Sequence, residues 1–580
     1  MLTFSTVVGY PEEGRWIGFA ATVGLAAIDG ARHLYKDRSI TIDLLDMLLA
    51  ALIAFGALSL LWSANVNGGI QTVIIAGACL LFALYLKRYA PRATTLAIAL
   101  GAGSAIVGSL VTNLWLPAAQ WSGFGNSGYA AEALILCLPF LWPLWRLEWE
   151  FTAVTQILAV VIAAAAIGYI VAFTPSAIGA FVLASFAAIA SLHWAFRRSM
   201  LLGWGCAALW LIIPPIVAWF GWEPLQLTER ILVRAELWLN AGFMILDRPL
   251  FGHGAGSFIE VYPLFKEAHG DLLPFVNKAF ESYVTEAEAL HNETLQLWTE
   301  LGTAGLLLLV AFYATALKAA AARFRHDVFA QAGGAALLAA LAESFLEYPF
   351  QRAATLFLAV IALAFATRDA APAIPQWRLK LARPVAATTA SIAAVAAVLL
   401  LVASYRQFEA ERRLDQTHAP GIDPVIAFNL TYEAHRLDPL DRRIRAALPI
   451  MLDGVIRARG LAAVPRATVD QIYRDVDNGA RYNTSALVAH AQYLLEASGG
   501  DDPSFLTVLA DLKRGSSRVA AAYAIEARYL IAHRRFAEAV AVATTGQKYT
   551  DGVSSIPSAD AAIKANLAAL RQLAERNLPH

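Results

Sequence analysis

The sequence has little charge and little cysteine. Only 16% of its 580 residues are Asp, Glu, Lys or Arg, and the 45 acidic and 45 basic side chains cancel, so composition gives no reason to expect nucleic-acid binding. The three cysteines, Cys79, Cys137 and Cys206, all lie in apolar runs, which leaves the polar segments without disulfides. Residues 1–14 are polar, contain two Glu and lack a basic stretch, so we expect no removable signal peptide.

Several local motifs of catalysis are also missing. The sequence has no phosphate-binding P-loop, no hydrolase nucleophile elbow and no Asp-rich cation motif. His253, His269, Asp271 and His291 are not at the short spacings that place two ligands on one helix face. We therefore expect neither a metal ion nor another cofactor.

The sequence is instead rich in long apolar runs. Hydrophobic residues make up 58% of the chain, far above a soluble average. A bilayer span needs about 20 apolar residues, and it is helical because lipid offers the backbone no hydrogen-bond partners. The sequence therefore predicts an all-α polytopic membrane protein with about twelve spans. The spans fall near 16–31, 47–63, 69–86, 94–116, 128–145, 151–173, 177–196, 201–220, 297–317, 329–346, 354–367 and 384–403.

Basic residues in the short loops predict the orientation of these spans. Five clusters would lie on one side of the membrane, which the positive-inside rule makes the cytoplasmic side. The clusters are Arg32-Lys36-Arg38, Lys87-Arg88-Arg92, Arg197-Arg198, Lys318-Arg323-Arg325 and Arg368-Arg378-Lys380-Arg383. The long loop 221–296 and everything after Ser404 then face outward.

Four parts of the chain follow from this pattern. A transmembrane bundle covers 1–220, a large outer loop 221–296, a second set of transmembrane helices 297–404, and a charged, Ala-rich helical domain 405–580. In the last part, Val519 to His533 and Phe536 to Tyr549 are typical of a helix pair. Such pairs are typical of tetratricopeptide-like repeats, so we expect a degenerate repeat domain, with an irregular helical bundle as the alternative.

The polar segment from Glu288 to Gly302 runs directly into the apolar stretch 306–310. This places His291, Asn292 and Glu293 at a membrane–water boundary, where a lipid-borne substrate would present its head group. His291 stands at the N-terminal end of a predicted helix, which attracts anions, and an imidazole titrates near neutral pH as a general base must. The alternative is a histidine that only caps or hydrogen-bonds at the interface.

Two arginines in the outer loop form a second candidate site. Arg230 and Arg234 are i,i+4 neighbours on a predicted helix, and no acid stands three or four residues from either. Like charges at this spacing repel, and an anion bound between them would relieve the repulsion. Guanidinium groups suit phosphate through their planar fork. The alternative is that both pair with distant acids or with lipid phosphates.

The loop continues with Asp247-Arg248-Pro249-Leu250-Phe251-Gly252-His253-Gly254-Ala255-Gly256. No strand precedes it and its glycine spacing is not that of a dinucleotide fingerprint, so we expect a tight turn that shapes the backbone near the site. His253 is then more readily structural than catalytic, although it stays a candidate contact to substrate.

Read together, these motifs resemble the O-antigen ligase/polymerase superfamily over residues 45–405. The resemblance rests on Arg234-x-x-x-Trp238, on the 247–254 turn, on Ala289-Leu290-His291-Asn292-Glu293-Thr294-Leu295-Gln296 and on Glu300-Leu301-Gly302. Three further stretches match in kind: 122–130, 173–176, and Ser344-Phe345-Leu346-Glu347-Tyr348-Pro349-Phe350-Gln351.

The resemblance implies a GT-C-like, metal-independent inverting glycosyltransferase of the bacterial inner membrane, with its active site and C-terminal domain in the periplasm. Such enzymes take a glycan from an undecaprenyl-pyrophosphate carrier and pass it to an acceptor hydroxyl. Arg234 matches a pyrophosphate-binding arginine, and His291 matches the base or acceptor-positioning residue. The family's second arginine before this histidine is absent from 253–290, so Arg230, Arg248 or Arg352 would substitute for it.

We expect a polymerase of lipid-linked repeat units for an O-antigen or exopolysaccharide. A ligase acting on a lipid A-core acceptor is the alternative, and transfer to a protein hydroxyl is a third. The C-terminal domain would contact the growing chain or polysaccharide-assembly proteins. The alternatives to glycosyl transfer are a non-catalytic scaffold and a transporter. A transporter would need ionisable residues in mid-membrane.

Overall fold

The computed structural model describes residues 11–101, 127–143, 227–269, 287–368, 373–477, 480–550 and 557–578, apart from a few single-residue gaps, together with scattered residues between 153 and 205. Most of these residues are helical and only two short strands are described, so the all-α prediction is confirmed. Within the described part of the chain, Cys79 and Cys137 are buried free thiols.

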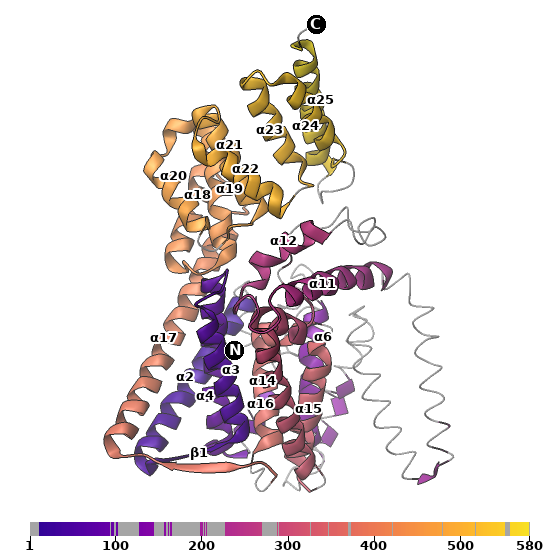
Figure 1. The fold of residues 1–580 in the computed structure, drawn as a ribbon. Helices are drawn as coiled ribbons and strands as arrows, with labels where there is room; N and C mark the ends of the chain where they lie inside the picture. Colours follow the sequence, from indigo (N-terminus) through magenta and orange to yellow (C-terminus); the bar gives the residue numbers. More distant parts are fainter. Residues whose placement is uncertain are drawn as a thin grey trace.

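The described elements follow one another as mostly antiparallel helices (Figure 1). The first part contains α2 (Pro11–Asp37), β1 (Ser39–Asp43), α3 (Leu44–Ser59), α4 (Val66–Arg88), α6 (Ser127–Cys137) and η1 (Leu138–Leu141). The middle part contains α11 (Leu227–Asp247), α12 (Phe258–His269), α14 (Glu293–Arg323), α15 (Val328–Ser344), η3 (Pro349–Gln351), α16 (Ala353–Thr367), β2 (Gln376–Lys380) and α17 (Arg383–Gln416).

Three described helices are long and apolar enough to cross a membrane: α4, α14 and α17. Shorter apolar helices cover the expected spans at 47–63, 128–145, 329–346 and 354–367, and the span expected at 16–31 lies within α2. The spans expected at 94–116, 151–173, 177–196 and 201–220 lie largely outside the described residues. The described part of the chain therefore has three clear candidate spans where the sequence predicts about twelve in all.

The core of the helical bundle is built around α16. Every residue of this helix from Ala353 to Thr367 is buried except Phe357, and α15 packs along it. Gly333 of α15 allows this close approach, because a Cβ there would lie 2.6 Å from the backbone nitrogen of Ala366. Small residues at such a contact favour tight packing of apolar helices.

One end of the bundle gathers the basic clusters. Strand β1 pairs antiparallel with β2, which brings Ser39 opposite Lys380. The ammonium of Lys87, only 3% exposed, lies 2.6 Å from the carboxylate of Asp43 and 2.7 Å from that of Asp46. Burial of such charges is tolerated only when they are paired. Lys87 is predicted from the sequence to be a charge of a cytoplasmic loop, whereas in the structure it belongs to a buried ion-pair network.

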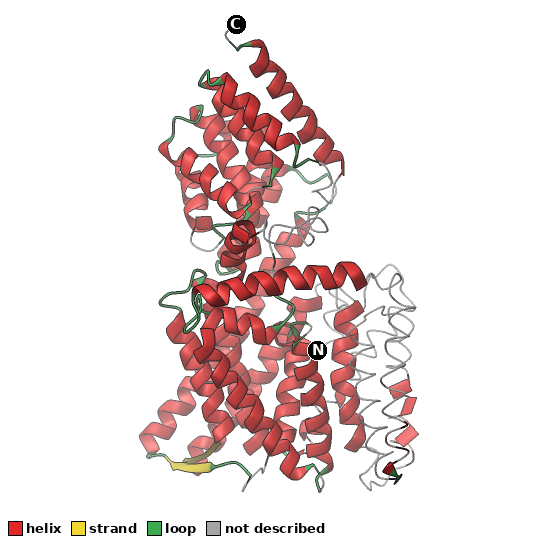
Figure 2. Ribbon diagram, turned by 45° about the vertical axis from the view of Figure 1, so that its right-hand side comes forward, coloured by secondary structure: helices red, strands yellow, loops and turns green. Residues whose placement is uncertain are grey.

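The C-terminal helices stand at the opposite end of the bundle from β1, as Figures 1 and 2 both show. They are α18 (Pro424–Leu437), α19 (Arg442–Arg459), η4 (Leu461–Ala463), α20 (Arg466–Asp477), α21 (Thr484–Ser498), α22 (Pro503–Gly515), α23 (Ala520–Ala532), α24 (Phe536–Gln547) and α25 (Pro557–Arg576). The helix pair predicted at 519–549 is present as α23 and α24. α17 runs unbroken past Ser404, so the boundary expected between 404 and 405 lies inside a helix.

Candidate functional site

Helix α11 carries Arg234 across the end of the bundle that faces the C-terminal helices (Figures 1 and 2). The guanidinium Nη2 of Arg234 lies 2.5 Å from Oε1 of Glu347, which is 113 residues later in the chain. Both side chains are mostly buried, at 18% and 11% exposed. An ion pair in such surroundings is held more firmly than one in water, because less solvent screens it.

His291 lies on the other side of the same carboxylate. Its Nδ1 is 2.7 Å from Oε2 of Glu347, and because an ionised carboxylate can only accept, Nδ1 is assigned as the donor. The backbone of His291 is left-handed, with φ of 52°, which is uncommon for a residue with a side chain. Neighbouring contacts hold it there: the indole of Trp238 donates to the carbonyl of Leu290 at 3.1 Å.

Two residues beside Glu347 complete this arrangement. The ring of Tyr348 meets the His291 imidazole edge to face, with ring centroids 5.0 Å apart. The guanidinium of Arg352 lies over the Tyr348 ring at 4.9 Å and donates to its hydroxyl at 3.1 Å. We call Arg234, His291, Glu347, Tyr348 and Arg352 the Glu347 cluster. It joins α11, the residue before the N-cap of α14, and the segment between α15 and α16.

Asn292 and Glu293 hold this architecture together. The Asn292 side chain caps α14 by accepting from the backbone N–H of Leu295 at 2.8 Å. The Glu293 carboxylate accepts from the backbone N–H of Phe350 at 3.1 Å and from the Gln351 amide at 3.3 Å. The start of α14 is thereby tied to the segment that bears Glu347. Both residues are predicted to bind substrate, and the described contacts show that they also fix the start of α14.

Two further acids lie close to the cluster. Glu132 of α6 is 2% exposed and is near enough to interact electrostatically with Glu347, Arg352 and Arg234. Glu343 of α15 is fully buried, interacts with Glu132 and Glu347, and neither of its carboxylate oxygens has a hydrogen-bond partner among the described residues. The site thus combines two arginines and one histidine with three carboxylates.

The glycine-rich turn after α11 shapes the backbone near the site, as the sequence predicts. The N–H groups of His253 and Gly254 donate to the carbonyls of Thr299 and Glu300 at 3.1 and 2.7 Å. His253 is 5% exposed, and its Nε2 lies 3.1 Å from the carbonyl oxygen of Met244. Burial lowers the pKa of His253, which favours its neutral form. In the described part of the chain, His253 contacts Met244, Asp247 and Phe265, none of which belongs to the Glu347 cluster.

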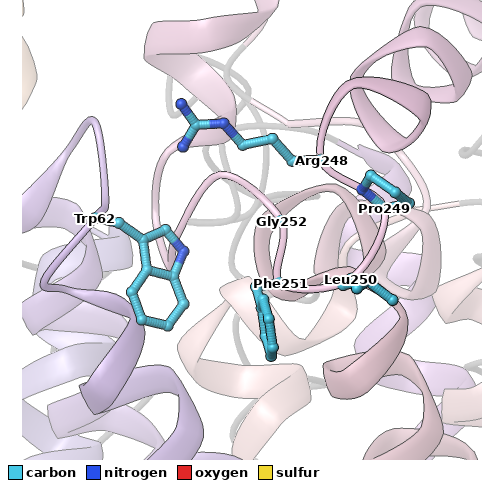
Figure 3. Close-up of a pocket in the computed structure, with 6 residues that line it drawn as sticks. All are labelled: Trp62, Arg248, Pro249, Leu250, Phe251 and Gly252. Atoms are coloured by element: carbon cyan, nitrogen blue, oxygen red, sulfur yellow. The ribbon is translucent and has the colours of Figure 1, made fainter.

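Arg248 lies at the far end of α11 from Arg234. Fourteen residues of helix place the two about 21 Å apart along the axis, so Arg248 cannot join Arg234 on one phosphate group. Arg248 is instead 53% exposed and lines a surface hollow with Trp62 and Phe251 (Figure 3). Arg230 lies one turn before Arg234 in α11, and its side chain is outside the described part of the structure.

The structure therefore brings together His291, Arg234 and Arg352 of the predicted set, and it adds Glu347, Tyr348, Glu132 and Glu343. Glu347 and Tyr348 belong to the 344–351 stretch of the family resemblance, which by itself assigns them no role. An acid next to an aromatic residue at the start of an outer loop was the available signal. The stretches 122–126 and 173–176, which contributed to the family resemblance, lie outside the described residues.

No group of three or more His, Cys, Asp or Glu side chains is placed to hold a metal ion within the described ranges. No protein-family model, curated protein or solved structure matches the chain.

Proposed function

We propose that the chain is a metal-independent, inverting membrane glycosyltransferase of the O-antigen ligase/polymerase type. The observation that carries this proposal is the Glu347 carboxylate, which binds Arg234 through one oxygen and His291 through the other. A base held by a carboxylate beside arginines suits transfer from a pyrophosphate donor, because the reaction needs a proton acceptor and charge stabilisation of the leaving group.

In this mechanism Glu347 fixes the proton on Nδ1 of His291 and leaves Nε2 free to act as the base. The acceptor hydroxyl oxygen bonds to the anomeric carbon of the donor. The bond from that carbon to the pyrophosphate oxygen breaks, and the hydroxyl proton goes to Nε2 of His291. Arg234 stabilises the departing pyrophosphate through its positive charge, and its planar guanidinium group suits phosphate oxygens. Arg352 supplies a second positive charge nearby.

The proposal includes a GT-C-like architecture of about twelve spans in the bacterial inner membrane, with the loop and C-terminal domain in the periplasm. Three candidate spans support a membrane location. The β1–β2 pair, which carries Arg378 and Lys380, lies at the end of the bundle opposite α11, the helix that bears Arg234 (Figure 1). This arrangement agrees with a positive side and a catalytic side. The donor is an undecaprenyl-pyrophosphate-linked glycan.

We propose polymerisation of lipid-linked repeat units as the reaction. The C-terminal helices stand over the end of the bundle that holds the cluster, where they would contact a growing chain or polysaccharide-assembly proteins (Figure 1). Transfer of glycan to lipid A-core, or to a protein hydroxyl, uses the same donor site and differs only in the acceptor.

Glycan profiling of a deletion strain tests this proposal. The strain is complemented with the wild type, His291→Ala, Arg234→Ala or the matched control His326→Ala, whose histidine is exposed at the other end of the bundle. At equal membrane levels, the first two variants should give no polymer and the control should give normal polymer. Accumulated single repeat units indicate a polymerase, whereas long chains left on the carrier indicate a ligase. Normal polymer from either site variant overturns the assignment.

A transporter is the second candidate, because Glu132 and Glu343 are buried acids next to charged partners. Ionisable residues in such positions are typical of ion pathways. A proton or ion flux through the purified protein in vesicles, lost in Glu343→Gln and retained in His291→Ala, would favour this function over transfer.

A further inference from the structure

The hollow between α3 and the turn after α11 has no role in the proposed reaction. Trp62, Arg248, Pro249, Leu250, Phe251 and Gly252 line it (Figure 3). The side chains that line the hollow are apolar except for that of Arg248. Trp62 and Phe251 form an aromatic group with Phe55, in which each pair of ring centroids is 6.4 Å apart.

Hydrogen bonds to α14 hold the backbone of the turn, while its apolar side chains are exposed. The carbonyl of Pro249 accepts from both the backbone N–H and the hydroxyl of Thr303 at 2.8 Å, and that of Leu250 accepts from the N–H of Ala304 at 3.1 Å. Yet Leu250 is 63% and Phe251 57% exposed. The bonded backbone keeps the two side chains at the surface, where an external apolar medium would stabilise them by removing them from water.

The position of the hollow indicates that this medium is lipid. Trp62 lies four residues before α4. Thr303, which donates to Pro249, lies three residues before the apolar run of α14, and both helices are candidate spans. The hollow is therefore at the ends of two spans. Tryptophan is enriched at that depth in membrane proteins, where the aromatic ring meets the head groups.

Arg248 gives the hollow its chemical selectivity. The Arg248 side chain extends over the hollow toward Trp62 in Figure 3. Its nearest described acid is Asp247, whose carboxylate is 3.8 Å from Nε, beyond hydrogen-bond distance, and both side chains are 53% exposed. The guanidinium fork thus keeps donors for an external phosphate.

We propose that this hollow is a binding site for a glycerophospholipid of the outer leaflet. Arg248 binds the lipid phosphate, and the acyl chains lie against Leu250, Phe251 and Trp62. The site is about 21 Å along α11 from Arg234, so it is separate from the donor site of the proposed reaction.

Native mass spectrometry of the detergent-purified full chain tests this site. The probes are dioleoyl phosphatidylglycerol and dioleoylglycerol, which lacks the phosphate. The wild type should retain the phospholipid in preference to dioleoylglycerol. Arg248→Gln should weaken retention about tenfold, as expected for one lost charge-assisted contact, and Arg248→Lys should restore part of it. Arg459→Gln, which removes an exposed arginine of α19, is the matched control and should have no effect.

Phe251→Ser tests the apolar half of the site and should also reduce retention. Thermal unfolding of each variant verifies that it is folded. If Arg248→Gln does not fold, Arg248→Lys still tests the contact with the lipid phosphate. Equal retention of both probes, or an equal loss in Arg459→Gln, overturns the proposal. Displacement of the phospholipid by a polyprenyl phosphate at lower concentration would also overturn it, because the occupant would then be a carrier lipid.

Discussion

The carboxylate of Glu260 in α12 accepts a hydrogen bond from Nε of Arg442 in α19 at 2.6 Å, across 182 residues of sequence. Glu260 is 3% exposed, and its other oxygen accepts from the backbone N–H of Tyr482 at 3.3 Å. On its opposite face α12 packs against α11 and Leu290 in one small core. The C-terminal domain is thus connected through α12 to the two segments that carry Arg234 and His291.

A second contact supports this connection. With its amide oxygen turned toward the guanidinium, Asn67 of α4 accepts from both terminal nitrogens of Arg445 at 2.8 and 2.9 Å. Arg445 is 5% exposed, so the contact is shielded from solvent. The domain is attached to both the bundle and the loop by buried charged groups.

We expect Arg442→Met to destabilise the attachment, because it leaves the Glu260 carboxylate buried without its charged partner. Removing one member of a buried pair costs about 3–5 kcal/mol. Limited proteolysis of the full chain should show faster cleavage between α12 and α14, and transfer activity should fall. Arg459→Gln, whose exposed pair with Asp423 contributes little, is the control. Unchanged proteolysis in Arg442→Met would show that α12 is held by its apolar contacts alone.

We expect Glu347→Gln to reduce turnover about a hundredfold, the range that correctly placed acid–base groups contribute. The amide cannot accept from both Arg234 and His291, because one of its two ends is a donor. kcat should fall far more than KM for the lipid-linked donor, and Glu347→Asp should recover part of the loss. Steady-state kinetics in vesicles give both constants. The exposed Glu538→Gln serves as the control, and a change in KM alone would remove Glu347 from the positioning role.

Gly302→Ala should destabilise the protein. The φ of Gly302 is 64°, and an added Cβ would lie 2.4 Å from the carbonyl carbon of Leu250. Strain in this backbone region costs on the order of 1–3 kcal/mol before any clash. Gly460→Ala is the matched control, since its φ is 84° and nothing lies within 4 Å of the added atom. Thermal unfolding should show a larger loss for Gly302→Ala; equal losses would mean that the turn yields to the methyl group.

The C-terminal domain should lose stability as the pH falls from about 6.5 to about 4. Burial lowers the pKa of His490 to about 4, and its ring stacks on Tyr473 at 3.6 Å. Below the ordinary pKa of histidine, about 6.5, the unfolded chain binds a proton that the folded chain does not, so the free energy of unfolding falls. Thermal unfolding of the full chain measures the slope. His490→Phe should flatten it, and His533→Gln, at an exposed histidine, should not.

The residues of the Glu347 cluster differ in how far local sequence predicts them. His291 is predictable because it precedes an N-cap asparagine and an apolar helix, and Arg234 because it lacks a local acid. Glu347 is not predictable from local sequence, since its partners are 56 and 113 residues away. Arg248 is the reverse case, because it is close to Arg234 in sequence but is separated from it by the length of α11.

The sequence by itself determined the helical class, the apolar runs, the helix caps and the α23–α24 pair, because these depend on side chains within a few residues of one another. Only the tertiary structure decided which carboxylate meets Arg234 and His291, that Lys87 is buried with Asp43 and Asp46, and that Glu260 connects α12 to α19. Such pairs form between distant segments. The packing of whole helices decides them, because it excludes water and determines which charged groups lie close enough to pair.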